Sequence, residues 1–299
     1  MEPTEFIWMD GELISWGEAK VHVLTHSLHY GGGAFEGIRC YETKKGTAVF
    51  RLEDHMKRLL YSAKVLEMKV PYSIEQLNEA TLELLRKCEM KEGYIRPIIY
   101  FGYGKMGLNP TGSPIETVIA CWGWGKYLEH EAVDVKTSDY IRIHPKSTVT
   151  DAKITGHYVN STLASLALAG TGAHEALLLD HEGNVAEGPG ENIFMVKDGE
   201  LKTPAQGNIL PGLTRDTVMT LAKDQGLSVR EEVLRLDDLL GADELFFTGT
   251  AAEVTAIASL DGHKFGDGSP GPITKQLKQS YMAVVRGEDL NYEHYLTYI

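Results

Sequence analysis

Lys153 lies in the segment VTDAKITGHYVNS, directly before an apolar run, and is a candidate for covalent amine chemistry. Tyr158 follows five residues later, where its hydroxyl could hydrogen-bond a ligand that the lysine holds. Glu187, in VAEGPGEN, lies in a glycine-rich turn at a predicted strand end, where a carboxylate can be buried against a ligand. Most single lysines are solvated surface residues. A catalytic role for Lys153 is therefore favoured only if the chain supplies partners for it.

Three places in the sequence could bind a phosphate. In LPGLTRDTV, Gly212 and Thr214 open a predicted helix, whose unpaired N–H groups and dipole favour an anion, although Thr214 could be only an N-cap. Thr250 follows Gly249 at the end of another predicted strand, and Arg58 lies on an amphipathic helix, where it points inward or is solvated. Together these signals predict one monophosphate group rather than a nucleotide.

The common nucleotide, metal and hydrolase motifs are absent. In YGGGAFEG, Glu36 replaces the third glycine of a dinucleotide fingerprint, and GDGSPG is followed by Pro272 instead of the Lys-Ser/Thr of a P-loop. The histidines form no HExxH motif, so His26 and His29 are interpreted as strand or turn packing rather than a metal pair. No nucleophile-elbow serine is present. These patterns disfavour hydrolase, NTPase and metalloenzyme functions.

Composition indicates a globular protein of 299 residues with a net charge of −13. Such a charge repels phosphate backbones and anionic lipids, so nucleic acid and membranes are unexpected partners. No apolar run reaches membrane-spanning length, and the acidic start lacks the features of a secretory signal. Cys40, Cys88 and Cys121 are too few and too scattered for a disulfide framework or a zinc site. A cytoplasmic protein with reduced thiols is expected.

Local patterns in the first part of the chain predict strands and helices. Asp10-Gly11 in FIWMDGELI indicates a hairpin, and Ser73 with Gln76 has capping-box spacing ahead of LNEATLELLRKCEM. A further helix is predicted in EDHMKRLLYSAKVLEM, and apolar strands in YIRPIIYFGYG and TVIACWGWG.

In the second part, a helix is predicted after Lys153 and another in TRDTVMTLAKDQG, with Gly226 just past its end. Strands are predicted around ALLLD, NVAEG, NIFMV and ELFFTGT. The polar, aperiodic stretch at residues 125–133 is interpreted as a linker between a small domain, residues 1–124, and a larger one, residues 134–299. The fold class is therefore mixed α/β (α+β) in two domains, not a doubly wound parallel sheet.

These candidates match what pyridoxal 5′-phosphate needs from a protein. The cofactor carries one phosphate and an aldehyde, and its pyridine nitrogen must face a carboxylate for the ring to act as an electron sink. Lys153 is the candidate for the Schiff base, Glu187 for the pyridine nitrogen, and Tyr158 for the ring oxygen.

The order and spacing of AKITGHY, EGPGENIF, LPGLTRD and TGTAAE resemble the fold-type IV pyridoxal-phosphate enzymes. With YGGGAFEGIR near the start, the chain resembles the branched-chain-amino-acid aminotransferases, from about residue 6 to residue 285. The resemblance implies two α/β domains with the cofactor between them, in homodimers or assemblies of dimers. It also implies transamination between leucine, isoleucine or valine and 2-oxoglutarate.

The resemblance also implies roles for individual residues. Lys153 becomes the Schiff-base lysine and proton shuttle, Tyr158 the partner of the ring oxygen and Glu187 that of the pyridine nitrogen. Arg58, Leu213, Thr214 and Thr250 hold the phosphate. Thr250 and Ala251 offer N–H groups to the substrate α-carboxylate, assisted by Tyr94, and Arg39 and Arg96 receive the second carboxylate of glutamate. Leu108 reaches the pocket of the neighbouring subunit. The residues that line the side-chain pocket are Tyr30, Phe35, Gly37, Trp124 and Tyr127.

Several alternatives stay open at this stage. Tyr30 and Phe35 would also suit an ordinary core, and Arg96 a surface salt bridge. The three successive glycines at residues 31–33 are expected to loosen the pocket wall and widen the substrate range. A D-amino acid or (R)-amine aminotransferase and an aminodeoxychorismate lyase share the fold, but FEGIR and YIRP favour the branched-chain class. A non-catalytic metabolite-binding protein would need neither Lys153 nor Glu187.

Overall fold

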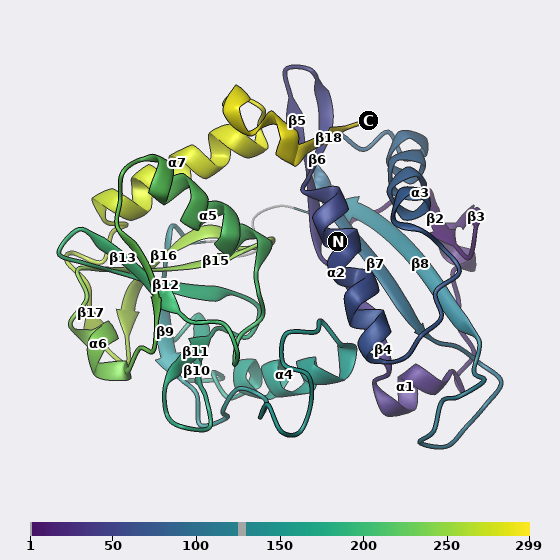
Figure 1. Ribbon diagram of the computed structural model, residues 1–299, viewed down its shortest axis with the longest axis horizontal. Coiled ribbons are helices and arrows are strands. Elements are labelled where there is room, and N and C mark those ends of the chain that lie inside the picture. Colours follow the sequence, from purple (N-terminus) through teal and green to yellow (C-terminus); the bar gives the residue numbers. More distant parts are fainter. Residues whose placement is uncertain (1, 125–129) are drawn as a thin grey trace. The chain divides into compact units, whose positions relative to one another are not determined.

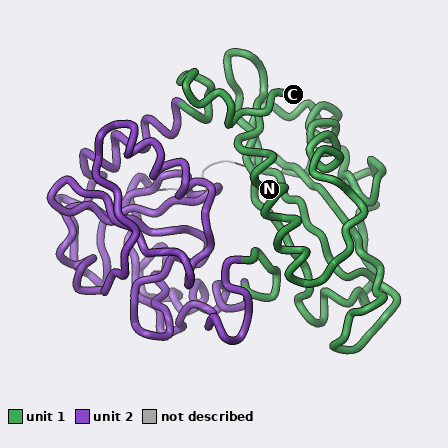
Figure 2. The backbone as a smooth tube through the Cα atoms, in the orientation of Figure 1, with its two compact units in different colours: residues 1–125, 152–157, 284–299 green, residues 126–151, 158–283 purple. Residues whose placement is uncertain are grey.

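The structure is a computed structural model and describes residues 2–124 and 130–299. The chain divides into two compact units (Figure 2). The first comprises Met1–Gly125, Ala152–His157 and Val284–Ile299, and the second comprises Lys126–Asp151 and Tyr158–Ala283. This division differs from the contiguous one expected from the sequence, because a short segment around Lys153 and the C-terminal residues pack with the first unit.

The first unit is built on one antiparallel sheet in the order β18-β6-β5-β7-β8-β2-β3, with β1 paired to β8 and β4 to β7 (Figure 1). The predicted hairpin around Asp10 is confirmed, since β2 pairs with β3 directly across it. The strands are β1 (Glu2–Pro3), β2 (Phe6–Met9), β3 (Glu12–Ser15), β4 (Gly33–Phe35), β5 (Ile38–Thr43), β6 (Gly46–Phe50), β7 (Gly93–Phe101), β8 (Ile115–Gly123) and β18 (Leu296–Tyr298).

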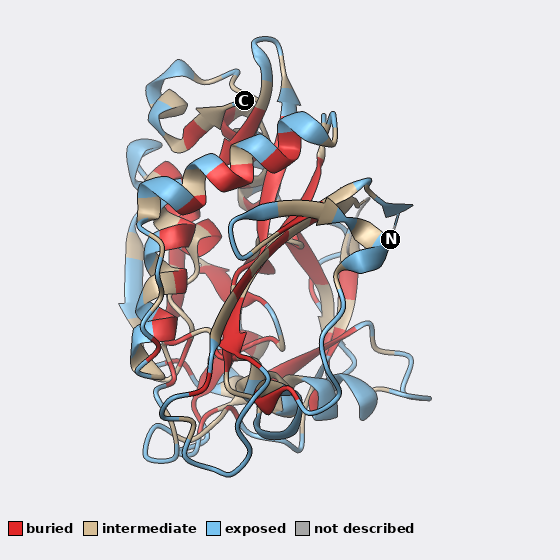
Figure 3. Cartoon of the chain, turned by 90° about the vertical axis from the view of Figure 1, so that its right-hand side faces the viewer, coloured by how far each residue is buried: buried red, intermediate tan, exposed pale blue. Residues whose placement is uncertain are grey.

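Helices α2 (Leu52–Val65) and α3 (Ile74–Lys87) cover one face of this sheet. Both are amphipathic, so their apolar sides are buried and their charged sides are exposed (Figure 3). The predicted capping box is confirmed, because the Ser73 hydroxyl accepts from Gln76 N–H while the Gln76 side chain accepts from Ser73 N–H. The remaining helices of this unit are η1 (Trp16–Glu18), α1 (His26–Tyr30), η2 (Thr155–His157) and η3 (Leu290–Tyr295).

Side chains alternate between the two faces of the sheet. On β7, Ile95 and Ile99 enter the core under α2 and α3, whereas Tyr94, Arg96 and Ile98 lie on the other face. That second face carries the candidate substrate-binding residues of the strand.

The second unit contains a closed ring of strands. Strand β11 pairs with both β10 and β12, so the order β11-β10-β9-β16-β15-β12 returns to β11. Inward-facing apolar residues such as Leu177, Ile193 and Phe247 fill its core. The strands are β9 (Ala132–Thr137), β10 (Glu175–Leu179), β11 (Val185–Glu187), β12 (Asn192–Lys197), β13 (Glu200–Pro204), β14 (Val229–Glu232), β15 (Glu244–Gly249), β16 (Glu253–Leu260) and β17 (His263–Lys264).

Among the described residues, four α-helices belong wholly or mainly to this unit: α4 (Tyr158–Leu166), α5 (Leu213–Asp224), α6 (Leu236–Leu240) and α7 (Pro272–Val285) (Figure 1). The predicted end of α5 is confirmed, because Gly226 follows the C-cap Gln225 with a positive φ of 79°. No helix in the described residues is long and apolar enough to cross a membrane.

Two local expectations need correction. Residues 132 and 133, expected in the linker, begin β9, because they pair with β16. His26 and His29 lie on helix α1 rather than in a strand or turn, and each ring bonds a backbone carbonyl, of Gly107 or Val23.

The glycines at residues 31–33 do not loosen the wall of the candidate substrate pocket, contrary to the expectation from the sequence. Each allows a close approach, since a Cβ on Gly31 would lie 2.8 Å from Gly156 Cα, and one on Gly32 would lie 2.8 Å from the Phe101 ring. Gly31 also has a positive φ of 67°. The run therefore tightens the packing here.

Candidate active site

Lys153 is anchored by its backbone beside Phe35. Its N–H donates to Ser62 Oγ (2.9 Å), and its carbonyl accepts from Phe35 N–H (3.1 Å). Its Nζ lies 5.2 Å from the centroid of the Phe35 ring. The structure therefore brings together two residues that are far apart in the chain and that the sequence proposed for one site.

Arg58 points inward from α2 and forms a buried ion pair with Glu36. Its Nε donates to Glu36 Oε1 (2.6 Å) and its Nη2 to Oε2 (2.9 Å), while His55 Nδ1 donates to Oε2 (2.8 Å). Burial by itself would raise the pKa of Glu36, but the Arg58 charge and the hydrogen bonds from Arg58 and His55 outweigh it and lower that pKa. The carboxylate is therefore ionised.

Sequence reasoning missed Glu36 and His55. Glu36 was noted only as the residue that breaks a nucleotide fingerprint. A sequence signal existed, because His55 and Arg58 are three residues apart and so share one side of α2. Nothing local indicated that their common partner would come from the end of β4.

Tyr94 and Arg96 lie on one face of β7, because residues two apart on a strand point to the same side. Arg96 Nη2 donates to the Tyr94 hydroxyl (3.1 Å), and its guanidinium carbon lies 5.0 Å from the Phe35 ring centroid and 5.9 Å from that of Trp122. The Trp124 ring lies 4.4 Å from that of Tyr94. Within the described residues, Arg96 has no carboxylate within salt-bridge distance, which argues against the surface salt bridge. Trp122 is an addition that sequence reasoning missed.

Gly37 is required by this arrangement. A Cβ at Gly37 would lie 1.9 Å from the Tyr94 hydroxyl, so only glycine allows that hydroxyl to occupy its position. Arg39, two residues further, is opposite Tyr94 in the β5–β7 register, is buried, and packs over the Tyr41 ring at 5.3 Å.

The remaining pocket candidates of the first part of the chain are exposed or lie outside the described residues. Tyr30 is exposed on α1 and contacts the His26 ring, and Leu108 is 83% exposed in the loop after β7. Tyr127 lies outside the described residues.

In the second unit, Glu187 is buried at the end of β11 and accepts three hydrogen bonds. Arg142 Nε donates to Oε1 (2.5 Å), whereas Asn192 Nδ2 and Leu210 N–H donate to Oε2 (3.0 Å each). Arg142 also donates to the Thr150 carbonyl (3.0 Å). Sequence reasoning found Glu187 but missed Arg142 and Asn192.

The anion-binding candidates of this unit lie at the start of a helix or in the turn after a strand. Helix α5 begins at Leu213 with Gly212 as its N-cap, so Thr214 lies buried in the first turn, and the interpretation of Thr214 as the N-cap is wrong. Thr250 and Ala251 form the half-buried turn after β15, and Tyr158 is the half-buried first residue of α4.

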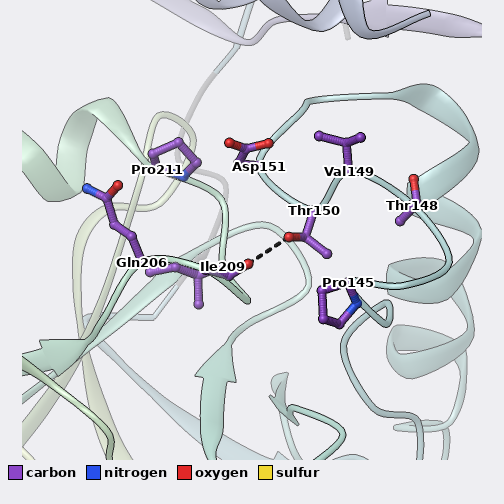
Figure 4. Close-up of a pocket in the computed structure, with 9 residues that line it drawn as sticks. Pro145, Thr148, Val149, Thr150, Asp151, Gln206, Ile209 and Pro211 are labelled. Carbon is purple, nitrogen blue, oxygen red and sulfur yellow. Dashed lines mark hydrogen bonds between the residues drawn. The ribbon is translucent and has the colours of Figure 1, made fainter.

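A cavity of about 310 Å³ lies where the Thr150 segment meets the loop before α5 (Figure 4). The Thr150 hydroxyl donates to the Gly207 carbonyl (2.7 Å) across it. Both segments support Glu187, because one holds the carbonyl that Arg142 bonds and the other supplies Leu210 N–H. No group of three or more His, Cys, Asp or Glu side chains in the described residues could hold a metal ion.

Comparison with known proteins identifies the family. The family described as amino-transferase class IV matches residues 33–260, which include the Lys153 and Glu187 segments. The chain belongs to the class IV aminotransferases. The fold expected from the sequence is thereby confirmed, since solved enzymes of this fold superpose on nearly the whole chain.

Several class IV relatives are close. A protein of Pseudomonas aeruginosa named branched-chain-amino-acid aminotransferase is 47% identical over 286 residues, which cover 94% of this chain and 93% of the relative. One of the same name from Escherichia coli K12 is 44% identical, covering 95% and 94%. The crystal structure of the T.th. branched-chain amino acid aminotransferase, complexed with N-(5′-phosphopyridoxyl)-L-glutamate, has a TM-score of 0.96 and 44% identity, covering 100% of this chain and 99% of that one.

Proposed function

We propose that this protein is a pyridoxal-phosphate-dependent branched-chain-amino-acid aminotransferase. It exchanges the amino group between leucine, isoleucine or valine and 2-oxoglutarate, and forms the branched 2-oxo acids and L-glutamate. The observation that carries this proposal is the likeness over nearly the whole chain to enzymes with that name, one of them solved with a phosphopyridoxyl derivative of glutamate.

The hydrogen bonding of Glu187 fits the cofactor. A carboxylate offers about four acceptor positions, and Arg142, Asn192 and Leu210 N–H use three of them. The remaining position suits a protonated pyridine nitrogen. When bound, pyridoxal phosphate supplies an electron sink for the charge that develops when the substrate Cα–H bond breaks.

The other residues have complementary tasks. Lys153 Nζ would hold the cofactor aldehyde and, once released as a free amine, would be the base that moves the substrate Cα proton. Tyr158 donates to the ring oxygen. Arg58, the N–H groups at Leu213 and Thr214, and the hydroxyls of Thr214 and Thr250 would bind the phosphate, because a guanidinium group and the N–H groups at a helix start both favour an anion.

In the substrate pocket, Tyr94 and the N–H groups of Thr250 and Ala251 bind the α-carboxylate. The aliphatic side chain packs against Tyr30, Phe35, Trp124 and Tyr127, with Leu108 contributing to the pocket of a neighbouring subunit. A distal carboxylate buried without a partner would cost several kcal/mol, so glutamate needs Arg96 or Arg39, which leucine does not contact.

Replacing Arg96 with leucine should selectively impair glutamate and 2-oxoglutarate. We expect a loss of about 1.5–3 kcal/mol for these two substrates, the usual worth of a hydrogen bond to a charged group, and little loss for leucine. Single-turnover rates with each amino donor test this, with the exposed Arg86→Leu on α3 as the control. Equal losses for leucine and glutamate would show that Arg96 supports the site generally.

Replacing Gly37 with alanine should displace the Tyr94 hydroxyl. The new methyl group cannot coexist with that hydroxyl at 1.9 Å, so Tyr94 must move and its bond to Arg96 must break. Misplacement of about 1 Å can cost about 10²-fold, and we expect losses in kcat/KM of about 10–100-fold for leucine and glutamate alike. Gly17→Ala is the control, because a Cβ there meets nothing within 4 Å. An unchanged kcat/KM for Gly37→Ala would exclude Tyr94 from substrate binding.

We also propose a cytoplasmic homodimer, or an assembly of dimers. The sheet face that carries Ile98 and Val118 lines an apolar cavity of about 390 Å³, and Val23 and Leu28 beside it are 71% and 62% exposed. A second copy of the chain would bury this surface. Sedimentation should give twice the chain mass or a multiple of it, and Leu28→Glu should shift it toward the monomer. The free thiols of the three cysteines suit a reducing compartment.

An absorption spectrum of the purified protein tests the function directly. A yellow band should bleach when L-leucine is added and return when 2-oxoglutarate follows. D-Alanine should leave it unchanged, and aminodeoxychorismate should yield no pyruvate. A protein without the band after incubation with pyridoxal phosphate, or one that responds to D-alanine alone, would contradict the proposal.

A further inference from the structure

Glu36 is a fully buried carboxylate whose visible partners are all donors. Its backbone N–H donates to the Pro97 carbonyl (2.9 Å), which holds the residue between β4 and β5. Its two oxygens accept both hydrogen bonds from Arg58 and the one from His55. The side chain is 0% exposed and that of Arg58 is 11% exposed, so water does not compete for this pair.

We propose that Glu36 is a positioning residue for the cofactor phosphate. It fixes the plane and direction of the Arg58 guanidinium, and His55 holds Glu36 in the rotamer that does so. This inference rests on the proposed function, because it takes Arg58 as a phosphate ligand.

The geometry favours positioning over general stabilisation. A buried ion pair contributes little net stability compared with apolar residues of the same size, because both charges lose their hydration. The ion pair instead fixes the orientation of the Arg58 guanidinium. Glu36 accepts hydrogen bonds from both Nε and Nη2, and two bonds hold a planar group in place, whereas a single bond would allow it to rotate.

His55 acts in this arrangement as a neutral donor. Its burial, together with the nearby charges of Arg58 and Lys153, lowers its pKa against the opposing effect of Glu36. A neutral imidazole that donates from Nδ1 orients the carboxylate without adding a second positive charge. The charge of Glu36 therefore pairs with that of Arg58, and the hydrogen bond from His55 fixes the orientation of the Glu36 carboxylate.

The test is the preference of the apoprotein for pyridoxal phosphate over pyridoxal, which lacks the phosphate. Both affinities are measured by absorbance titration for wild type, Glu36→Asp, Glu36→Gln, Arg58→Ala and the double variant Glu36→Gln/Arg58→Ala. Glu36→Asp keeps the charge but shortens the side chain, so it separates position from charge. Glu53→Gln is the control, because Glu53 forms an exposed ion pair with Lys57 on the same helix.

We expect Glu36→Asp and Glu36→Gln each to lower the preference for the phosphorylated form at least tenfold, about 1.4 kcal/mol, while pyridoxal binds as before. In the Arg58→Ala background, Glu36→Gln should change the preference less than twofold, because a residue that acts through Arg58 has no effect without it. The double variant also removes both buried charges and so remains testable if Glu36→Gln alone folds poorly.

The outcomes separate this inference from the function that it rests on. If wild type itself does not prefer pyridoxal phosphate, the proposed function fails. If wild type prefers it and both Glu36 variants keep that preference, the function stands and the positioning role is wrong. Equal losses for both ligands, or a full effect of Glu36→Gln without Arg58, would mean that Glu36 only supports the local fold.

Discussion

Lys153→Ala should abolish transamination while the protein stays folded. The lysine is needed as the group that holds the cofactor aldehyde and as the base that moves the substrate proton. The proton transfer alone contributes about 10²–10⁴-fold to the rate. Alanine has no amine and can perform neither task.

The structure gives a reason for the fold to survive. The hydrogen bonds from Lys153 N–H to Ser62 and from Phe35 N–H to the Lys153 carbonyl involve its backbone and persist in alanine. The contact of Nζ with the Phe35 ring is lost, and such contacts contribute about 0.5–2 kcal/mol.

The measurement is the rate of the leucine half-reaction by rapid mixing, together with the unfolding midpoint. Lys57→Ala on α2 is the control for the loss of a lysine, since Lys57 forms an exposed pair with Glu53. Substantial residual transamination by Lys153→Ala would remove Lys153 from the catalytic role. Loss of folded protein in that variant would contradict the backbone anchoring.

Glu187→Gln is expected to bind the cofactor but to react slowly. A neutral amide cannot keep the pyridine nitrogen protonated, so the ring becomes a weaker electron sink. Loss of one preorganised electrostatic partner typically costs about 10²–10³-fold, and we expect that range for the leucine half-reaction.

The hydrogen bonds of Glu187 predict a second effect of the same change. Arg142 donates to one carboxylate oxygen, and Asn192 and Leu210 N–H donate to the other. Whichever way the glutamine amide is turned, its NH₂ group faces a donor. A buried donor without an acceptor costs about 1–3 kcal/mol, so Glu187→Gln should also unfold more easily.

Rate and stability are therefore measured on the same samples. Glu175→Gln is the matched control, because Glu175 is a buried carboxyl on neighbouring strand β10 whose pKa is raised by burial. The Glu175→Gln substitution should leave the rate of the leucine half-reaction unchanged. An unaltered rate in Glu187→Gln would mean that another residue faces the pyridine nitrogen.

The sequence by itself determined the local structure and the chemistry of the motifs. The turn at Asp10, the capping box at Ser73 and the end of α5 at Gly226 depend on backbone preferences and hydrogen bonds within a few residues, so they could be predicted from their own segments. Lys153 and Glu187 could be found as well, because each lies in a motif whose residue types and spacing match a known chemistry.

Only the tertiary structure decided what surrounds those residues. Arg142 precedes its partner Glu187 by 45 positions, and Glu36 precedes Arg58 by 22. Whether such residues meet depends on strand pairing and on how a helix packs on a sheet, and a slip of one residue would turn a side chain to the opposite face. These partners therefore became visible only when β4, β11 and α2 were in place, because no local preference encodes a contact between distant segments.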